Sequence, residues 1–172
     1  MEQKVTPPWM IALITSLACI VINIAAYAMN QLTNKSFGNI QILLVFGVVI
    51  WACIFYAKQM QGQVSYGNVF AHGFKVTAGI AALLAIYIFV SVKFIYPEII
   101  DLTIEQSRIE MEKVGKLTTD QIDEYLKLTR NNFLSFSIGF SIFFIALVGV
   151  IGSLIGAGFA KKNPTNPFQN AS

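Results

Sequence analysis

The chain has 172 residues, of which 55% are hydrophobic and 12% are charged, and its mean hydropathy is +0.63. Soluble domains carry about 25% charged residues, so a chain of this length with half that share is not expected to fold as a soluble domain. The net charge of +3 is small and no basic stripe interleaved with aromatic residues is present, so nucleic acid is not an expected partner.

Four long stretches without charge predict four membrane-spanning helices. These stretches cover residues 5–34, 36–57, 76–92 and 131–160. A helix needs about 20 apolar residues to cross the hydrocarbon core of a bilayer, and we place the spans at about 9–29, 39–57, 76–96 and 133–160. The runs are continuous rather than alternating, which indicates helices and not barrel strands. The expected fold class is all-α: a four-helix transmembrane bundle, forming a single integral membrane domain over residues 1–162.

The first predicted span must be distinguished from a cleaved signal peptide. The sequence AYA at 26–28 resembles a cleavage site of small residues. However, the apolar run is longer than the usual 7–15 residues, and the single leading base, Lys4, is offset by Glu2. We therefore expect a retained helix.

The segment between the second and third spans, residues 58–75, is polar and contains the single histidine of the chain, His72. No second metal ligand or catalytic partner stands near His72 in the sequence. We interpret it as a loop residue at the membrane interface, and a proton-transfer or headgroup contact is the open alternative. Residues 65–75 also have the pattern of an interfacial helix with three apolar residues toward lipid, Val69, Phe70 and Phe74.

Fourteen of the 21 charged residues lie between Lys93 and Arg130. Apolar residues recur there at helical spacing, which predicts two amphipathic helices, about 98–114 and 119–130. Gly115 is expected to end the first helix in the left-handed conformation, and Thr118 with Gln121 predicts a capping box that begins the second. Glu112 and Lys116 stand four residues apart in the order that favours an ion pair. The sequence therefore predicts an extramembrane helical hairpin over residues 97–131, between spans 3 and 4.

The charges of this hairpin are of both signs, which suits solvated, paired helices better than metal chelation. An ion site or a protein-partner site is the open alternative. We identify no catalytic, cofactor-binding or metal-ligating residue, and no cofactor is expected. Cys19 and Cys53 each lie alone in an apolar run and are expected to pack as small hydrophobic residues.

The fourth span carries small residues at steps of four. These helix-packing candidates are Gly149, Gly152, Ser153, Gly156 and Ala157. Such rows let helix backbones approach closely, either within one bundle or in a homodimer. Polar residues in the spans are expected to hydrogen-bond across helices; they are Asn23, Gln41, Ser135, Ser137 and Ser141. No charged residue lies deep in a span, which disfavours an ion-coupled transporter.

Four spans put both termini on one side of the membrane. That side holds Glu2 and five bases, Lys4, Lys58, Lys75, Lys161 and Lys162. The other side holds eight acids and seven bases, Lys35, Lys93, Arg108, Lys113, Lys116, Lys127 and Arg130. The number of bases alone, seven against five, would place the hairpin side in the cytoplasm. The bases of the hairpin, however, belong to a folded, internally paired element, which weakens this rule. We expect both termini in the cytoplasm.

Several stretches carry a family resemblance over nearly the whole chain. They are SYGNVFAHGFKVTAGI at the third span, IYPEIIDLTIEQSRIEMEKVG and KLTTDQIDEYL in the hairpin, and the glycine-rich fourth span ending in AKK. With these, the chain resembles domain-of-unknown-function family 4199, small four-span proteins typical of Bacteroidota. The resemblance implies a bacterial inner-membrane location and no known catalytic or cofactor residues. A membrane-associated glycosyltransferase is a frequent gene neighbour in the family, which hints at envelope glycan assembly.

The function expected from these features is that of a non-enzymatic scaffold or accessory subunit in a membrane complex. Membrane lipid surrounds the spans, and the hairpin at 97–131 offers a surface for a protein partner. A small transporter or channel is the alternative. An enzyme is not expected, because no nucleophile–base pair or ligand cluster stands near a membrane face. Residues 163–172 are expected to form a disordered tail.

Overall fold

The computed structural model describes residues 5–31 and 34–161. Its elements are α1 (Pro8–Ala28), α2 (Lys35–Gln59), α3 (Tyr66–Val90), the short π-helical segment η1 (Ser91–Ile95), α4 (Ile99–Val114), α5 (Thr119–Asn131) and α6 (Phe133–Phe159). The described residues contain no strand, so the predicted all-α fold is confirmed. The tail predicted to be disordered, residues 163–172, lies outside the described residues.

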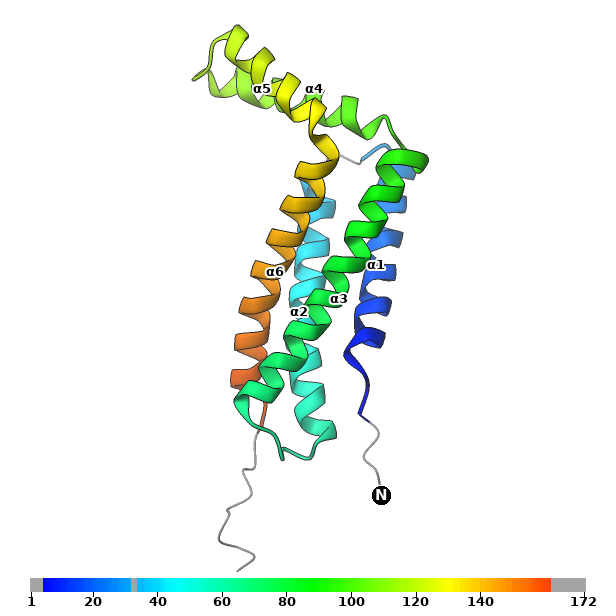
Figure 1. Ribbon diagram of the computed structural model, residues 1–172, viewed down its shortest axis with the longest axis vertical. Helices are drawn as coiled ribbons and strands as arrows, with labels where there is room; N and C mark the ends of the chain where they lie inside the picture. The colour runs from blue at the N-terminus through cyan, green and yellow to red at the C-terminus, as the bar shows by residue number, and fades with distance from the viewer. Residues whose placement is uncertain (1–4, 32–33, 162–172) are drawn as a thin grey trace, which may run out of the picture.

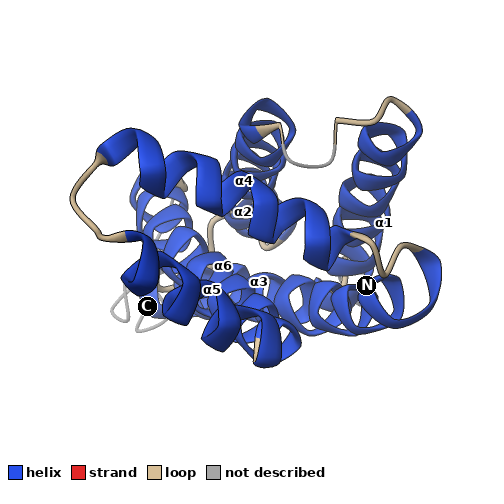
Figure 2. Cartoon of the chain, turned by 90° about the horizontal axis from the view of Figure 1, so that it is seen from above, coloured by secondary structure: helices blue, strands red, loops and turns tan. Residues whose placement is uncertain are grey.

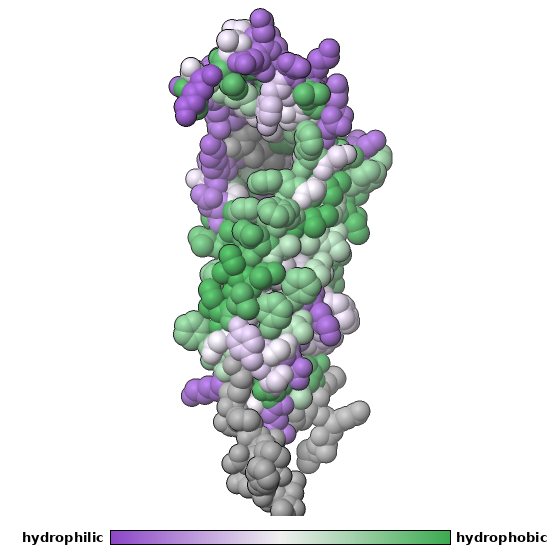
Figure 3. Space-filling view, turned by 60° about the vertical axis from the view of Figure 1, so that its left-hand side comes forward, coloured by the Kyte–Doolittle hydropathy of each residue, from purple (hydrophilic) through white to green (hydrophobic). Residues whose placement is uncertain are grey.

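The helices form an upright bundle with a hairpin across one end. In Figure 1, α1, α2, α3 and α6 run side by side, and α4 and α5 lie across their top. The start of α1, the turn between α2 and α3 and the end of α6 share the opposite end. We call the two ends of the bundle the hairpin end and the termini end. Figure 3 shows one face of the molecule, where a broad hydrophobic belt covers the bundle and hydrophilic side chains are concentrated on the hairpin.

Four helical segments are long and apolar enough to cross a membrane: α1, α2, α3 continued by η1, and α6. Large apolar side chains point outward from them, among them Leu43 and Phe140, each 69% exposed. Soluble monomers rarely expose apolar patches larger than a few hundred Å². The chain therefore has the architecture of a multi-pass membrane protein, and lipid is the solvent of its belt.

Helix α3 occupies the centre of the bundle, because it packs against α1, α2 and α6. Its buried side chains include Val69, Val76 and Ile80, each 0% exposed. Val76 and Ile80 belong to a core cluster shared with α1 and α2, and Val69 belongs to a second cluster nearer the termini end. The core of the bundle thus follows one face of α3.

All five helix-packing candidates of α6 are buried within the chain. A Cβ added to Gly149 would overlap the side chain of Thr77 on α3, and one added to Gly156 would lie 2.7 Å from Cys53 Cβ on α2. The backbone of α3 approaches α6 closely as well, since a Cβ added to Gly73 would lie 2.6 Å from Ser153 Oγ. The small residues let α6 approach two helices of the same chain at backbone distance.

The third span begins earlier than expected. The sequence predicts an interfacial helix at 65–75 and a span at 76–96, but α3 runs without a break from Tyr66. The Ser65 side chain caps it by accepting a hydrogen bond from the backbone N–H of Asn68 at 3.2 Å. Val69, expected to face lipid, is fully buried, whereas Phe74 is 43% exposed. The segment joins the bundle because Gly73 permits the close contact with α2 and α6.

The predicted hairpin is present, with α4 and α5 close to their expected bounds. Gly115 ends α4 with φ 63°, and Thr118 and Gln121 form the capping box of α5. The predicted pair of Glu112 with Lys116 is wrong: Glu112 lies 3.9 Å from Arg108, one turn earlier in the helix. Because Gly115 ends α4, Lys116 lies beyond the helix and is not placed one turn from Glu112 on the same helix face.

A methyl group at Gly149 should destabilise the bundle. Gly149→Ala must displace Thr77, whose hydroxyl donates to the Gly73 carbonyl at 3.0 Å, and such overpacking costs about 1–3 kcal/mol. The apparent melting temperature in mild detergent should therefore fall. Gly139→Ala is the matched control, because a Cβ there meets no atom within 4 Å and alanine favours the helix. Equal melting of the two variants would contradict this packing.

Candidate functional site

The hairpin is attached to the bundle by side chains at the foot of α4. The Tyr27 hydroxyl at the end of α1 donates to Glu98 Oε1 at 2.9 Å. The Tyr27 ring stacks on Tyr96, with 4.9 Å between the ring centroids. Tyr96 is 3% exposed, and its hydroxyl is hydrogen-bonded to that of Tyr87 on α3. The chain between η1 and α4 is thus fixed against both α1 and α3.

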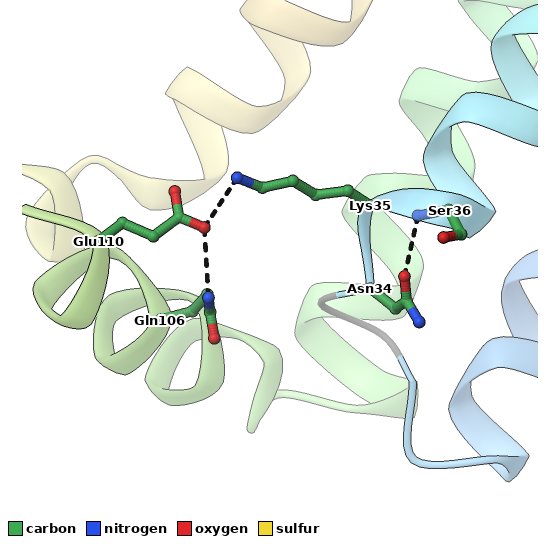
Figure 4. A network of polar contacts seen from close by, with 5 residues as sticks. All are labelled: Asn34, Lys35, Ser36, Gln106 and Glu110. Atoms are coloured by element: carbon green, nitrogen blue, oxygen red, sulfur yellow. Dashed lines mark hydrogen bonds and ion pairs between the residues drawn. The ribbon is translucent and has the colours of Figure 1, made fainter. Parts of the chain in front are cut away.

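A second attachment joins the middle of α4 to the start of α2. Lys35 Nζ lies 2.9 Å from Glu110 Oε1, and the Gln106 side chain donates to the same oxygen at 3.2 Å. Figure 4 shows the three side chains meeting, with Asn34 capping α2 through the backbone N–H of Ser36. The contact holds α4 across the bundle, where Figure 2 shows it passing between α2 and the pair α3 and α6.

Ion pairs join α4 to α5. Arg108 lies 2.5 Å from Asp123, and Arg130 pairs with Asp101 at the other end of the hairpin. Acids and bases of the hairpin thus meet each other across its two helices. Within the described residues, no group of three His, Cys, Asp or Glu side chains lies close enough to hold a metal ion.

The ion pairs shift two pKa values. The hydrogen bond with Lys35 lowers the pKa of Glu110, and the bond from Gln106 acts in the same direction. The hydrogen bond with Asp123 raises the pKa of Arg108, so that guanidinium stays charged at every physiological pH. The ionisation of Glu110 is therefore tied to the docking of the hairpin on the bundle.

The hairpin leaves apolar side chains uncovered. Helix α4 has no buried residue, and α5 buries Ile122 and Leu126. The exposed large apolar residues between the two ends of the hairpin are Leu102, Ile109, Val114, Leu117, Tyr125 and Leu128. Tyr125 faces the bilayer side, where it lines a groove with Phe136 and Phe140 of α6. Val114 and Leu117 lie at the α4–α5 turn, which extends beyond the edge of the bundle in Figure 1.

His72 lies in α3 near the termini end and not in a loop. It is 7% exposed, and its ring stacks on Tyr56 of α2 with 4.3 Å between centroids. Cys53, on the same helix as Tyr56, donates its S–H to the carbonyl of Val69 at 3.6 Å. In this place His72 acts as a packing residue between two helices.

Most of the polar residues of the spans gather at the hairpin end. Asn23, Gln41, Ser137 and Ser141 line a cavity of about 200 Å³ at the foot of the hairpin. Among the described residues, only Gln41 of this set makes the expected bond across helices, donating to the Cys19 carbonyl at 3.4 Å. Ser135 lies outside this set, in the groove below α5. Sequence reasoning found these residues singly but could not show that three separate helices bring them together.

The family described as "Protein of unknown function (DUF4199)" matches residues 11–162. The chain belongs to this family. No curated protein and no solved structure matches the chain. The DUF4199 match runs from the first turn of α1 to the end of α6, so it includes the hairpin.

The Lys35–Glu110 contact of this DUF4199 chain should be lost in acid. Because docking lowers the pKa of Glu110, the contact stabilises docking at pH above the ordinary carboxylate pKa. That stabilisation disappears as the pH falls through the lowered pKa. Spin labels at Lys116 and Ile40 should give a narrow distance distribution at neutral pH that broadens in acid.

Removing the charge should have the same effect without acid. In the Glu110→Gln variant, the distribution of distances between the two spin labels should be broad already at neutral pH. It should not change further as the pH falls into the acidic range. Glu124→Gln is the control, since Glu124 is exposed on α5 and makes no ion pair within the described residues. A narrow distribution in Glu110→Gln would show that the Tyr27–Glu98 attachment holds the hairpin alone.

Proposed function

We propose that this chain is a non-enzymatic scaffold or accessory subunit of a membrane complex and binds a protein partner through the hairpin at 97–131. The observation that supports the proposal is the uncovered apolar surface of the hairpin. Val114 and Leu117 are 62% and 45% exposed at its outer turn. Apolar residues surrounded by charged ones are the usual composition of a protein-binding patch.

The attachment of the hairpin at two points favours binding over simple solvation. A hairpin fixed at Glu98 and Glu110 loses little conformational freedom when a partner binds, which lowers the entropic cost of association. Charges of both signs beside the apolar residues supply orientation and discrimination between partners. A scaffold needs such a pre-formed surface and no reactive group.

We further propose a bacterial inner-membrane location with both termini cytoplasmic, so that the hairpin lies in the periplasm. The family resemblance supports the membrane, and the folding of the hairpin as one helical element, in which Arg108 and Arg130 pair with Asp123 and Asp101, supports the orientation. Envelope glycan assembly is the proposed context, supported by the glycosyltransferase gene neighbour of the family. A homodimer is a further possibility. It would need a surface other than the small residues of α6, which contact α2 and α3.

A small transporter or channel is the second candidate, supported by the polar cavity at Asn23, Gln41 and Ser141. The close packing of Gly149 and Gly156 closes the termini end of the bundle, so transport would require helix movement. Stopped-flow measurements on liposomes with the full chain would test it. Faster uptake of glycerol than in protein-free liposomes supports a channel. If glycerol, sugars and ions all enter no faster than they enter protein-free liposomes, the result opposes both a transporter and a channel.

Substitution at the outer turn should separate the chain from its partner. The double variant Val114→Ser and Leu117→Ser removes two exposed apolar side chains without touching an ion pair. Proteins that copurify with the tagged full chain from native membranes should fall by about tenfold, a loss of about 1.4 kcal/mol in binding. Quantitative mass spectrometry of the eluate measures this.

A second double variant is the matched control. Glu124→Ser and Lys127→Ser change exposed charged residues on α5 and should leave the copurifying proteins unchanged. Helical content and melting temperature should be alike in both variants. A chain that purifies alone in mild detergent, or a partner lost equally in both variants, would overturn the scaffold proposal.

A further inference from the structure

The space between α2 and α6 widens toward the hairpin end into two adjoining cavities. The deeper cavity, about 230 Å³, is lined mainly by apolar side chains such as Val45, Phe144 and Val148. The outer cavity, about 200 Å³, reaches Ile99 at the start of α4. Gln41, Leu84 and Ser141 line both cavities, so the two adjoin at these residues, one reaching toward mid-bundle and the other to the foot of the hairpin.

The lining of this space changes from apolar to polar along its length. Amide and hydroxyl groups of Asn23, Gln41, Ser137 and Ser141 lie at the outer part, and the inner part beyond Gln41 and Ser141 is almost wholly hydrocarbon. No charged side chain lines either cavity among the described residues. This is the order of groups in one leaflet of a bilayer: polar near water and hydrocarbon at depth.

Three of the polar side chains have no partner within the described protein. Asn23, Ser137 and Ser141 make no side-chain hydrogen bond, while Gln41 makes one, with its amide nitrogen. Polar groups left unpaired within a membrane cost free energy. Their arrangement around one space therefore favours a ligand that supplies both donors and acceptors.

The space faces the bilayer between α2 and α6. A Cβ added to Gly38 on α2 would meet no atom of the described residues within 4 Å, and Phe140 on α6 is 69% exposed. At the termini end the same two helices are in contact, since an added Cβ at Gly152 would lie 3.3 Å from Val49. A hydrocarbon chain can thus enter from the side and stops where the helices meet.

We propose that this space binds a membrane lipid with an uncharged, hydroxyl-bearing head, of the diacylglycerol class. One acyl chain fills the deeper cavity, and the glycerol hydroxyl and ester oxygens bond to Asn23, Gln41, Ser137 and Ser141 at the outer one. A phosphate head is disfavoured, because the cavities lack a base to neutralise it. This site is independent of the hairpin's protein partner.

Photolabelling with lipids of defined head groups tests the site. The full chain is reconstituted in phosphatidylethanolamine vesicles containing a small fraction of diacylglycerol with a diazirine in one acyl chain. A parallel sample carries the same acyl chain on phosphatidylglycerol. Mass spectrometry then locates the label. The diacylglycerol probe should label Val45 and Val148 in the cavity, and the phosphatidylglycerol probe should label mainly outward residues such as Leu43 and Ile142.

Two pairs of matched variants link the label to the cavity. Gly38→Leu and Ser141→Leu add bulk to its lining and should lower cavity labelling by about tenfold. Gly139→Leu and Ser135→Leu make the same changes on the outer surface of α6 and should leave it unchanged. The melting temperature of each variant shows whether the bundle is intact.

The outcomes that overturn the proposal are distinct. Labelling confined to outward residues, or cavity labelling that both Gly38→Leu and Ser141→Leu leave unchanged in an intact bundle, removes the site. Equal labelling of Val45 and Val148 by both probes removes the choice of an uncharged head. Neither result depends on whether a protein binds the hairpin.

Discussion

The close approach of α6 to α2 and α3 is the contact on which the rest of the structure depends. At Gly149 and Gly156 the helix backbone of α6 meets side chains of the neighbouring helices with no room for a methyl group. In a bilayer, apolar side chains gain little by leaving lipid, so packing and small residues drive helix association. This contact sets α3 in the centre and fixes the termini end of the bundle.

The two halves of α6 have different roles because they carry side chains of different size. Small residues from Gly149 to Ala157 close the bundle, whereas the other half carries Phe136, Phe140 and Phe144 among serines. The cavities lie at the half with the phenylalanines, where Phe140 and Phe144 line the deeper one. Tight packing at one end of the bundle and a lipid-facing space at the other thus come from one helix.

The hairpin depends on this bundle for its position. Its two helices pair with each other through Arg108 and Arg130, but the attachments that orient it come from α1 and α2, through Tyr27 and Lys35. Those residues reach Glu98 and Glu110 only because the bundle brings the upper ends of α1 and α2 beneath α4. The uncovered apolar residues of the hairpin are therefore presented at a fixed place above the membrane.

The sequence by itself determined the solvent, the spans and the hairpin. Charge-free runs of this length predict helices in lipid. Gly115, Thr118 and Gln121 specify where one hairpin helix ends and the next begins, since each of these signals is local. The tertiary structure alone decided that His72 and Val69 are buried, that Glu112 pairs with Arg108, and that Asn23, Gln41 and Ser141 surround one cavity. Burial and cavity lining depend on which helix faces which, and that is a relation between residues far apart in the chain.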